Sequence, residues 1–211
     1  MGHAPKKKRQ PQVAQLAAPD DGKPRCAWPL SNSLMVAYHD EEWGVPLHDD
    51  RRLFEYFVLD AFQAGLSWAI VLNKREGFRR AFAGFDPKKI AEFSERDIER
   101  LVADAGIIRN RQKIVATVSN ARIFLDVQQR QGSFDRYIWQ FAGGKPKVNR
   151  WKTLAQLPAR TPQSDEMSRA LRAEGFKFVG STICYAFTQA AGMVNDHIVS
   201  CYRWREVQET D

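Results

Sequence analysis

The sequence has no long apolar run and few cysteines. No apolar segment among its 211 residues reaches the roughly 18 that a membrane span needs. The first residues also lack the apolar region of a secretion signal, so we expect a cytoplasmic protein that does not enter a membrane. Only three cysteines are present, far apart, which excludes a disulfide framework and favours metal binding or plain burial. Internal repeats and alternating apolar and polar stretches of useful length are absent as well, and we therefore predict an all-α fold.

The composition is that of a basic globular protein. Apolar residues make up 44% of the chain and the formal net charge is +7, which favours a polyanionic partner. Residues 1–24 combine a Lys/Arg run with four prolines, and we predict a disordered basic tail before a single domain over residues 25–211. Lys6 to Arg9 resembles a nuclear import signal, but a solvated run with weak attraction for phosphate is the favoured interpretation.

Apolar residues recur at helical spacing along most of the domain. Ser94 with Asp97 has the pattern of a capping box, and Ser181 or Thr182 is a candidate cap for an apolar helix after Gly180. The other predicted helices are 50–64, 68–82, a short one opened by 86–87, one ending at 105–106, 107–131, 134–142 and 164–174.

Two cysteines and two histidines have spacings that suit a metal site. Cys26 and His39 form a C-x12-H pair, and His197 and Cys201 form an H-x3-C pair whose side chains would point the same way on a helix. A Cys2His2 set suits structural Zn²⁺, because two thiolates neutralise the dication and no position stays open for chemistry. Buried thiols and ordinary hydrogen-bonded histidines are the alternative. Cys184, inside the apolar helix, is predicted to be core.

Asp60 is a candidate site residue. It lies in the last turns of its predicted helix, where a carboxylate opposes the helix dipole. Exposure to water is one explanation. The other is a cleft in which Asp60 is surrounded by Trp28, Tyr38 and Trp68, so that an acid and several rings hold a flat ligand.

Several groups are candidates for contact with nucleic acid. Arg109, Arg111 and Lys113 place three cations at the start of a helix, where the dipole disfavours them unless a phosphate bridges them. A solvated face is the alternative. Lys177 adds a cation beside the Gly180 turn, whose helix N-terminus offers free N–H groups to an anion.

Five segments together resemble the bacterial DNA-3-methyladenine glycosylase I family. They are CAW (26–28), AYHDEEWGVP (37–46), QAGLSW (63–68), AGIIRNRQKI (105–114) and FKFVGSTICYAFTQAAGMVNDHIVSC (176–201). The resemblance implies an all-α helix-hairpin-helix fold, with two helical lobes and the base pocket between them. It also implies structural zinc on the Cys2His2 set, which clips the N- and C-terminal segments together.

The resemblance further implies a function and its residues. The enzyme would flip 3-methyladenine out of alkylated double-stranded DNA, hydrolyse its N-glycosidic bond and release the free base. Asp60 would hold the base with Tyr38 and Trp68 around it, and we expect Trp28 from the same cleft to contact the base as well. The hairpin at 175–182 would bind the DNA backbone. The residues involved would be Lys177, Val179, Gly180 and Ser181. We also expect Gly65 and Leu66 to fill the space left by the flipped nucleotide, and the protein to be a monomer.

This chain departs from the family pattern at two positions. The family's glutamate is Asp60 here, and a tyrosine common in the family is Met35. Helix-hairpin-helix relatives place a catalytic aspartate where this chain has Asn195, and lyase-type relatives carry a nucleophilic lysine where it has Ser181 or Thr182. Without that lysine we expect no strand cleavage. Because 3-methyladenine is bonded as a cation and leaves neutral, holding the base is the main requirement.

Three alternatives remain at this point. One is a non-catalytic helix-hairpin-helix module that binds DNA, and another is a glycosylase of the same fold for a different lesion. A metal-dependent hydrolase is the weakest, because four protein ligands leave no place for water on the metal.

Overall fold

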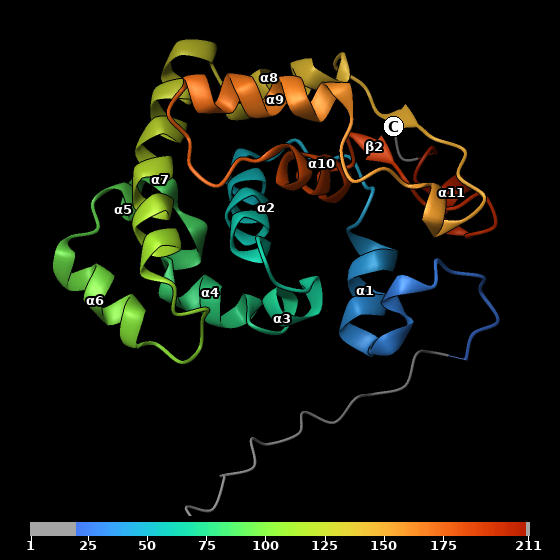
Figure 1. The fold of residues 1–211 in the computed structure, drawn as a ribbon, viewed down its shortest axis with the longest axis horizontal. Helices are drawn as coiled ribbons and strands as arrows, with labels where there is room; N and C mark the ends of the chain where they lie inside the picture. Colours follow the sequence, from blue (N-terminus) through green and yellow to red (C-terminus); the bar gives the residue numbers. More distant parts are fainter. Residues whose placement is uncertain (1–19, 210–211) are drawn as a thin grey trace, which may run out of the picture.

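The computed structural model describes residues 20–209, and these are mostly helical (Figure 1). The α-helices are α1 (Ser33–Glu41), α2 (Asp50–Gln63), α3 (Trp68–Asn73), α4 (Arg75–Ala81), α5 (Pro87–Ala91), α6 (Glu95–Ala103), α7 (Arg111–Gln131), α8 (Phe134–Trp139), α9 (Pro162–Ala173), α10 (Ser181–Ala190) and α11 (Arg203–Glu206). Short 3₁₀ helices are η1 (Trp28–Ser31), η2 (Ala83–Phe85), η3 (Gln140–Ala142) and η4 (Leu154–Gln156), and the strands are β1 (Lys147–Val148) and β2 (Val194–Asn195). None of the helices in residues 20–209 could span a membrane. The predicted tail lies almost wholly in residues 1–19, outside the described residues.

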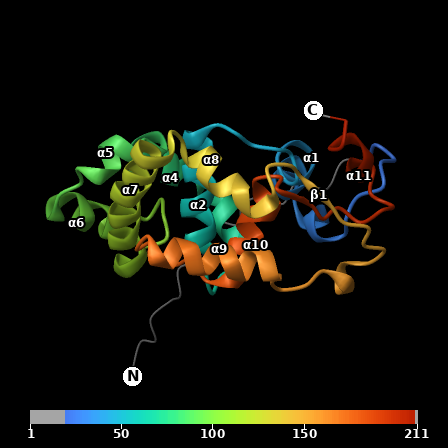
Figure 2. The ribbon, with the colours of Figure 1, turned by 90° about the horizontal axis from the view of Figure 1, so that it is seen from above.

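Helices α2 and α10 lie in the middle of an elongated molecule. Both views place α5, α6 and α7 at one end and α1 and α11 at the other (Figures 1 and 2). Every residue of α2 from Leu53 to Phe62 is buried, as expected for a helix that is enclosed on all sides. Asp49 caps α2 by accepting from the backbone N–H of Arg52.

Two apolar clusters make up the core. The larger one is built around α2, α7, α8 and α10. The smaller one joins the first described segment, α1 and the C-terminal segment through buried residues, which are Cys26, Met35, Tyr38, Trp43, Leu72 and Cys201. Trp68 packs against both clusters. The two clusters therefore meet beside α3.

The only paired strands among residues 20–209 form a two-residue parallel ladder. It pairs Lys147 with Val194 and Val148 with Asn195, and it fixes the segment that leads to His197. So short a ladder has no alternating pattern, which is why the sequence did not predict it.

Several boundaries differ from the sequence prediction. The helix predicted over 68–82 is broken at Lys74, whose φ/ψ of −101°/1° is not helical. Helix α7 begins at Arg111 rather than 107, because Asn110 caps it through the N–H of Lys113. The prediction that Ser181 or Thr182 caps α10 is wrong, since Gly180 is the N-cap and no side chain caps this end.

Candidate functional site

A pocket of about 220 Å³ lies where the two apolar clusters meet. Its walls come from η1, α1, α2, α3 and α10 and from two loops, and its lining residues are Trp28, Tyr38, Trp43, Asp60, Gln63, Trp68, Leu157, Ala186 and Gln189. The ring centroids of Tyr38 and Trp68 are 5.0 Å apart, and those of Trp28 and Tyr38 are 6.3 Å apart. The four residues predicted to form a cleft thus line one pocket.

Asp60 is buried in the pocket wall. Its exposed fraction is 2%, so the interpretation that it is exposed to water is wrong. Its Oδ2 atom is buried and has no hydrogen-bond partner among the described residues. Burial raises the pKa of this carboxyl well above its ordinary value. A carboxyl group kept in this state has unused hydrogen-bonding capacity for a ligand.

The aromatic wall is neutral and well packed. Burial, with the nearby charge of Asp60, raises the pKa of Tyr38 well above its ordinary value, so its hydroxyl stays protonated at neutral pH. The indole Nε1 of Trp68 is buried and has no acceptor among the described residues. Met35, one of the two departures from the family pattern, is 7% exposed and packs in the same cluster as Tyr38. The pocket combines flat apolar faces with few, unpaired polar atoms.

Sequence reasoning missed several pocket residues, namely Trp43, Gln63, Leu157 and Gln189. Ala186 and Gln189 are three residues apart on α10, so they share one face. The sequence does not distinguish that face from the other faces of an apolar helix. Only the packing of α10 against α2 shows which face lies beside Asp60.

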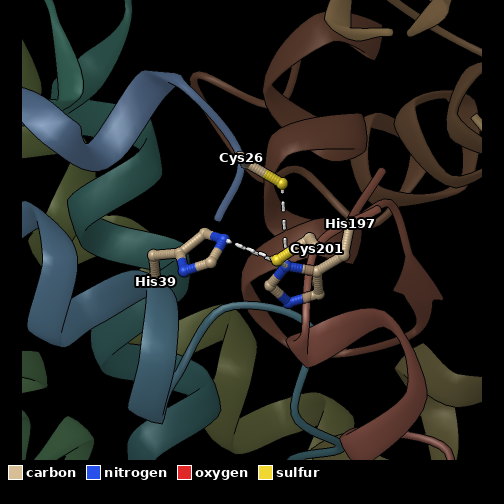
Figure 3. A group of neighbouring side chains, drawn as sticks. All are labelled: Cys26, His39, His197 and Cys201. Carbon is tan, nitrogen blue, oxygen red and sulfur yellow. Dashed lines mark hydrogen bonds between the residues drawn. The ribbon is translucent and has the colours of Figure 1, made fainter. Parts of the chain in front are cut away.

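The four predicted metal ligands lie together, and all are buried (Figure 3). Their ligand atoms are all within 4.8 Å of one another. His197 Nδ1 is 3.1 Å from His39 Nε2 and 3.6 Å from Cys201 Sγ, and Cys26 Sγ is 3.9 Å from His197 Nδ1. A tetrahedron built on Zn–N and Zn–S bonds has edges of about 3.3–3.8 Å, so the group has the size of a zinc site. The segment His197–Cys201 is a turn and not a helix, yet it brings both side chains to the same point.

Hydrogen bonds orient each imidazole toward the centre of the group. His39 Nδ1 is 2.7 Å from Asp40 Oδ1, and Asp40 is also held by Arg25. His197 Nε2 is 3.0 Å from the carbonyl oxygen of Trp43. Each acceptor fixes the proton on the outer nitrogen, so the inner nitrogen presents a lone pair.

The loop that carries the Trp43 carbonyl can approach because of Gly44. This residue has φ +80°, and a Cβ there would lie 3.1 Å from His197 Nε2. A larger residue would push the loop away from the imidazole.

The two thiols have opposite pKa shifts. The hydrogen bond with Cys201 and burial raise the pKa of Cys26, and the same hydrogen bond lowers the pKa of Cys201. Burial lowers the pKa of His197, which keeps its ring neutral. A divalent cation would stabilise both sulfurs as thiolates.

The residues predicted to face DNA differ in their surroundings. Gly65 is exposed at φ +80°, and Leu66 beside it is 39% exposed. Arg109 is also exposed. Arg111, however, pairs with Glu95 and Glu99, so it is not an uncompensated cation at the start of α7.

Lys113 is not at the surface. The residue is 6% exposed, and its ammonium donates to the carbonyl oxygens of Phe62 at 2.9 Å and Ala64 at 2.6 Å. These carbonyls belong to the C-terminal end of α2, where a cation is favourable. The expectation of a phosphate contact from Lys113 is wrong, and its side chain instead holds the end of α2 next to Gly65.

The 175–182 turn is tied to the core. The side chain of Asn120 on α7 accepts from the N–H of Lys177 and donates to its carbonyl, while the Lys177 side chain is exposed. Val179 is 3% exposed and its carbonyl accepts from Ser168, so the whole residue is buried. Ser181 is the first residue of α10.

Asn195 and Asp196 are both engaged in the interior. Asn195 Nδ2 donates to the Trp204 carbonyl, and its Oδ1 accepts from the N–H of His197. Asp196 is fully buried and accepts four hydrogen bonds. Neither side chain lines the 220 Å³ pocket.

Comparison with known proteins identifies the relatives of this chain. The methyladenine glycosylase family model matches residues 28–204. The chain is 51% identical to DNA-3-methyladenine glycosylase 1 of Escherichia coli (strain K12) over 177 residues, which are 84% of this chain and 95% of that protein. It is 45% identical to DNA-3-methyladenine glycosylase of Haemophilus influenzae over 177 residues, covering 84% and 96% of the two proteins.

Solved structures agree with the sequence matches. A crystal structure of 3-methyladenine DNA glycosylase I has a TM-score of 0.83 at 50% identity and covers 85% of this chain and 98% of that one. A structure of the Staphylococcus aureus enzyme, which concerns the structural basis of 3-methyladenine recognition, has a TM-score of 0.82 at 34% identity, with 84% and 95% covered.

Proposed function

Since this chain belongs to the methyladenine glycosylase family, we propose that it excises 3-methyladenine from alkylated DNA. The observation that carries this proposal is the buried carboxyl of Asp60, whose Oδ2 has no hydrogen-bond partner among the described residues, in a pocket walled by aromatic rings. Such a group gains most from a flat cation with polar edges. A 3-methyladenine nucleotide flipped from the duplex is a ligand of that kind.

The pocket supports the reaction by binding the base. Asp60 loses the stabilisation of water on burial, and a cationic base beside it restores a favourable partner for the carboxylate. Tyr38, Trp28 and Trp68 pack against the ring and exclude water from it. The bond from the base nitrogen to C1′ breaks, its electron pair neutralises the base, and a water oxygen adds to C1′ and loses its proton.

The reaction stops at base release. The first turn of α10 carries Ser181 and Thr182 and no lysine, so no amine is available there for a Schiff base with the sugar. We therefore expect a monofunctional glycosylase that leaves an abasic site and an intact strand.

We assign DNA contacts to one side of the pocket. The uncapped N-terminus of α10 at Gly180 offers backbone N–H groups to a phosphate, and the exposed side chains of Lys177 and Arg109 add positive charge. Val179 is buried as a whole residue, so it would support this turn from the interior and not face the DNA. This turn between α9 and α10 is the proposed hairpin, and the two apolar clusters are the proposed lobes.

The exposed turn after α2 is proposed to enter the duplex. Leu66 is exposed on a turn that Lys113 holds at the end of the helix carrying Asp60. An apolar side chain there could occupy the space of the flipped nucleotide. Leu66→Ala is expected to slow base release about tenfold or more; an unchanged rate would show that this turn has another role.

We further propose that the Cys2His2 group holds structural zinc. The four donors are of the types that zinc prefers, their spacing fits a tetrahedron, and each imidazole is oriented by an acceptor on its outer nitrogen. Four protein ligands leave no position for substrate, so the metal supplies no step of the reaction. It would join Cys26 to Cys201 and so close most of the chain into one loop.

The remaining proposals concern assembly and organisation. We propose one glycosylase domain over residues 25–211, a monomer in solution and a cytoplasmic location, with alkylated double-stranded DNA as the partner. The basic tail of residues 1–24 would add only weak attraction for phosphate.

Chromatography of bases released from methylated DNA tests the proposed function. We expect 3-methyladenine in the soluble fraction and 7-methylguanine left in the DNA. Binding of DNA without any released base would favour the non-catalytic DNA-binding module, and release of another base would favour a different lesion. Strand cleavage during the reaction would contradict the monofunctional assignment.

A further inference from the structure

The pocket contains two polar side chains to which the proposed reaction gives no part, Gln63 and Gln189. Gln189 lies on α10 three residues after Ala186, and both line the pocket with Asp60. The Nε2 atom of Gln189 is 2.8 Å from Asp196 Oδ2. The amide is therefore held from outside the pocket.

Asp196 fixes which way this amide faces. Its carboxylate is fully buried and receives four donors, which come from Asn149, Trp151, Tyr185 and Gln189. Four donors fill the lone pairs of a carboxylate, so Asp196 acts only as an acceptor toward Gln189. The –NH₂ group of Gln189 must then face Asp196, and its Oε1 is left to accept a hydrogen bond elsewhere.

Gln63, the other glutamine in the pocket, differs in this respect. No hydrogen bond from the described residues orients its amide, and it lies at the end of α2 beside the exposed turn. Gln189 is therefore the pocket amide whose acceptor oxygen is already oriented before a ligand binds. Such an oriented acceptor loses little conformational freedom on binding.

We propose that Gln189 is a specificity-determining residue that accepts a hydrogen bond from the exocyclic amino group of a flipped adenine. Asp196 is the positioning residue that keeps Oε1 available. Adenine carries an N6 amino donor, whereas guanine carries the O6 acceptor at the same place. Guanine would set oxygen against oxygen and leave both unpaired. The inference rests on the proposed function, and it predicts that the same pocket prefers 3-methyladenine to 3-methylguanine.

The test compares release of the two bases by two variants. Gln189→Met keeps the length of the side chain and removes the acceptor. Asp196→Asn places an amide against Gln189, which lets that side chain turn over and present Nε2 to the base. The matched control is Gln163→Met, an exposed glutamine that lines a separate cavity. Single-turnover rates are measured on methylated duplex DNA for 3-methyladenine and 3-methylguanine, with zinc content as a check on Asp196→Asn.

We expect the ratio of the two rates to fall about tenfold in Gln189→Met, the effect of removing one hydrogen bond. It should fall further in Asp196→Asn and stay unchanged in Gln163→Met. A purely structural role would lower both rates together and leave the ratio intact, and that result for Gln189→Met would overturn the inference. If Asp196→Asn loses zinc, the ratio of rates measured for Gln189→Met tests the inference without it.

Two further outcomes are also informative. If Gln189→Met releases neither base, the affinities of the two free bases, measured by quenching of the pocket tryptophans, take the place of the rates with the same expected change in ratio. If the wild-type protein releases no methylated base, the proposed function fails, which is distinct from a wild-type enzyme whose selectivity Gln189 does not affect.

Discussion

The carboxyl of Asp60 lies in the interior with no hydrogen-bond partner for Oδ2 among the described residues. Burial raises the pKa of this carboxyl above the ordinary value of 3.8. At a pH between 3.8 and the raised pKa, the folded protein keeps a proton that the unfolded chain has released. The free energy of unfolding therefore falls as the pH rises through that window. The site is held at a cost in stability at neutral pH.

Asp60→Asn should remove this cost. We expect the variant to be more stable than the wild type by about 1–3 kcal/mol near pH 8, or about 2–4 °C in Tm for each kcal/mol. The gain should shrink as the pH falls toward 3.8. Thermal unfolding followed by circular dichroism from acid to pH 8 checks this, with exposed Asp126→Asn as the control. A gain that does not depend on pH would mean that Asp60 is ionised at no cost.

Lys113 makes a second prediction at this scale. Its ammonium donates to the carbonyls of Phe62 and Ala64 in the interior, so Lys113→Met leaves the end of α2 unpaired. We expect a loss of about 1–3 kcal/mol in stability and slower base release, because the turn at Leu66 loses its support. Urea unfolding and single-turnover rates measure both effects. Exposed Lys88→Met is the control, and equal behaviour of the two variants would contradict the role of Lys113.

At the scale of elements, the metal group connects the segment before α1 to the segment before α11. Asp40 orients His39 from outside the group, and outer partners of this kind alter metal affinity about 10–100-fold. We expect one zinc per chain, lost in Cys201→Ala and bound more weakly in Asp40→Asn.

Elemental analysis and competition with a chelator measure these changes. Cys184→Ala is the matched control, because Cys184 is equally buried but outside the group. Zinc retained in Cys201→Ala, or lost in Cys184→Ala, would contradict the assigned ligands. Because the group has no open coordination position, we expect base release to continue in every variant that keeps its zinc.

Helix periodicity and capping patterns predicted most of the elements. Helix α2 and the Ser94–Asp97 capping box of α6 agree with the sequence patterns. The break at Lys74 carries no Pro or Gly signal, since tertiary packing sets it. Three of the 3₁₀ turns do contain or adjoin such a residue, namely Pro29, Gly84 and Gly143, but this signal marks a turn without giving its type. The cap of α10 was mispredicted because Ser181 lies one position inside the helix, where its side chain cannot reach back to the free N–H groups.

At the scale of the whole molecule, the metal group and the cleft around Asp60 could be predicted because each combines unusual residue types. Gln189 and Leu157 could not, since a glutamine on an apolar helix and a leucine in a loop carry no chemical signal until α10 packs beside α2. Charge was misleading in two places for the same reason. Arg111 is neutralised by acids on α6, and Lys113 is buried under α2.

Binding to DNA should reflect which cations are free of acidic partners. Lys177→Ala and Arg109→Ala are each expected to reduce the slope of log K against log[salt] by about 0.9 for every phosphate that the side chain neutralises in the wild type. Arg111→Ala should change it little, because Arg111 pairs with Glu95 and Glu99. Fluorescence anisotropy with an unmodified duplex at several salt concentrations measures these slopes. A larger change in Arg111→Ala than in Lys177→Ala would place the DNA on a different face.

We propose that the pocket around Asp60 binds and releases a methylated adenine. The most direct measurement is the single-turnover rate of 3-methyladenine release from methylated duplex DNA by wild type and Asp60→Asn at pH 7.5, with duplex affinity measured in parallel. We predict that the variant folds, binds DNA as the wild type does and releases the base at least about a hundredfold more slowly, because the base no longer has a charged partner. Equal rates for the two proteins would show that the base is held elsewhere and would contradict the account.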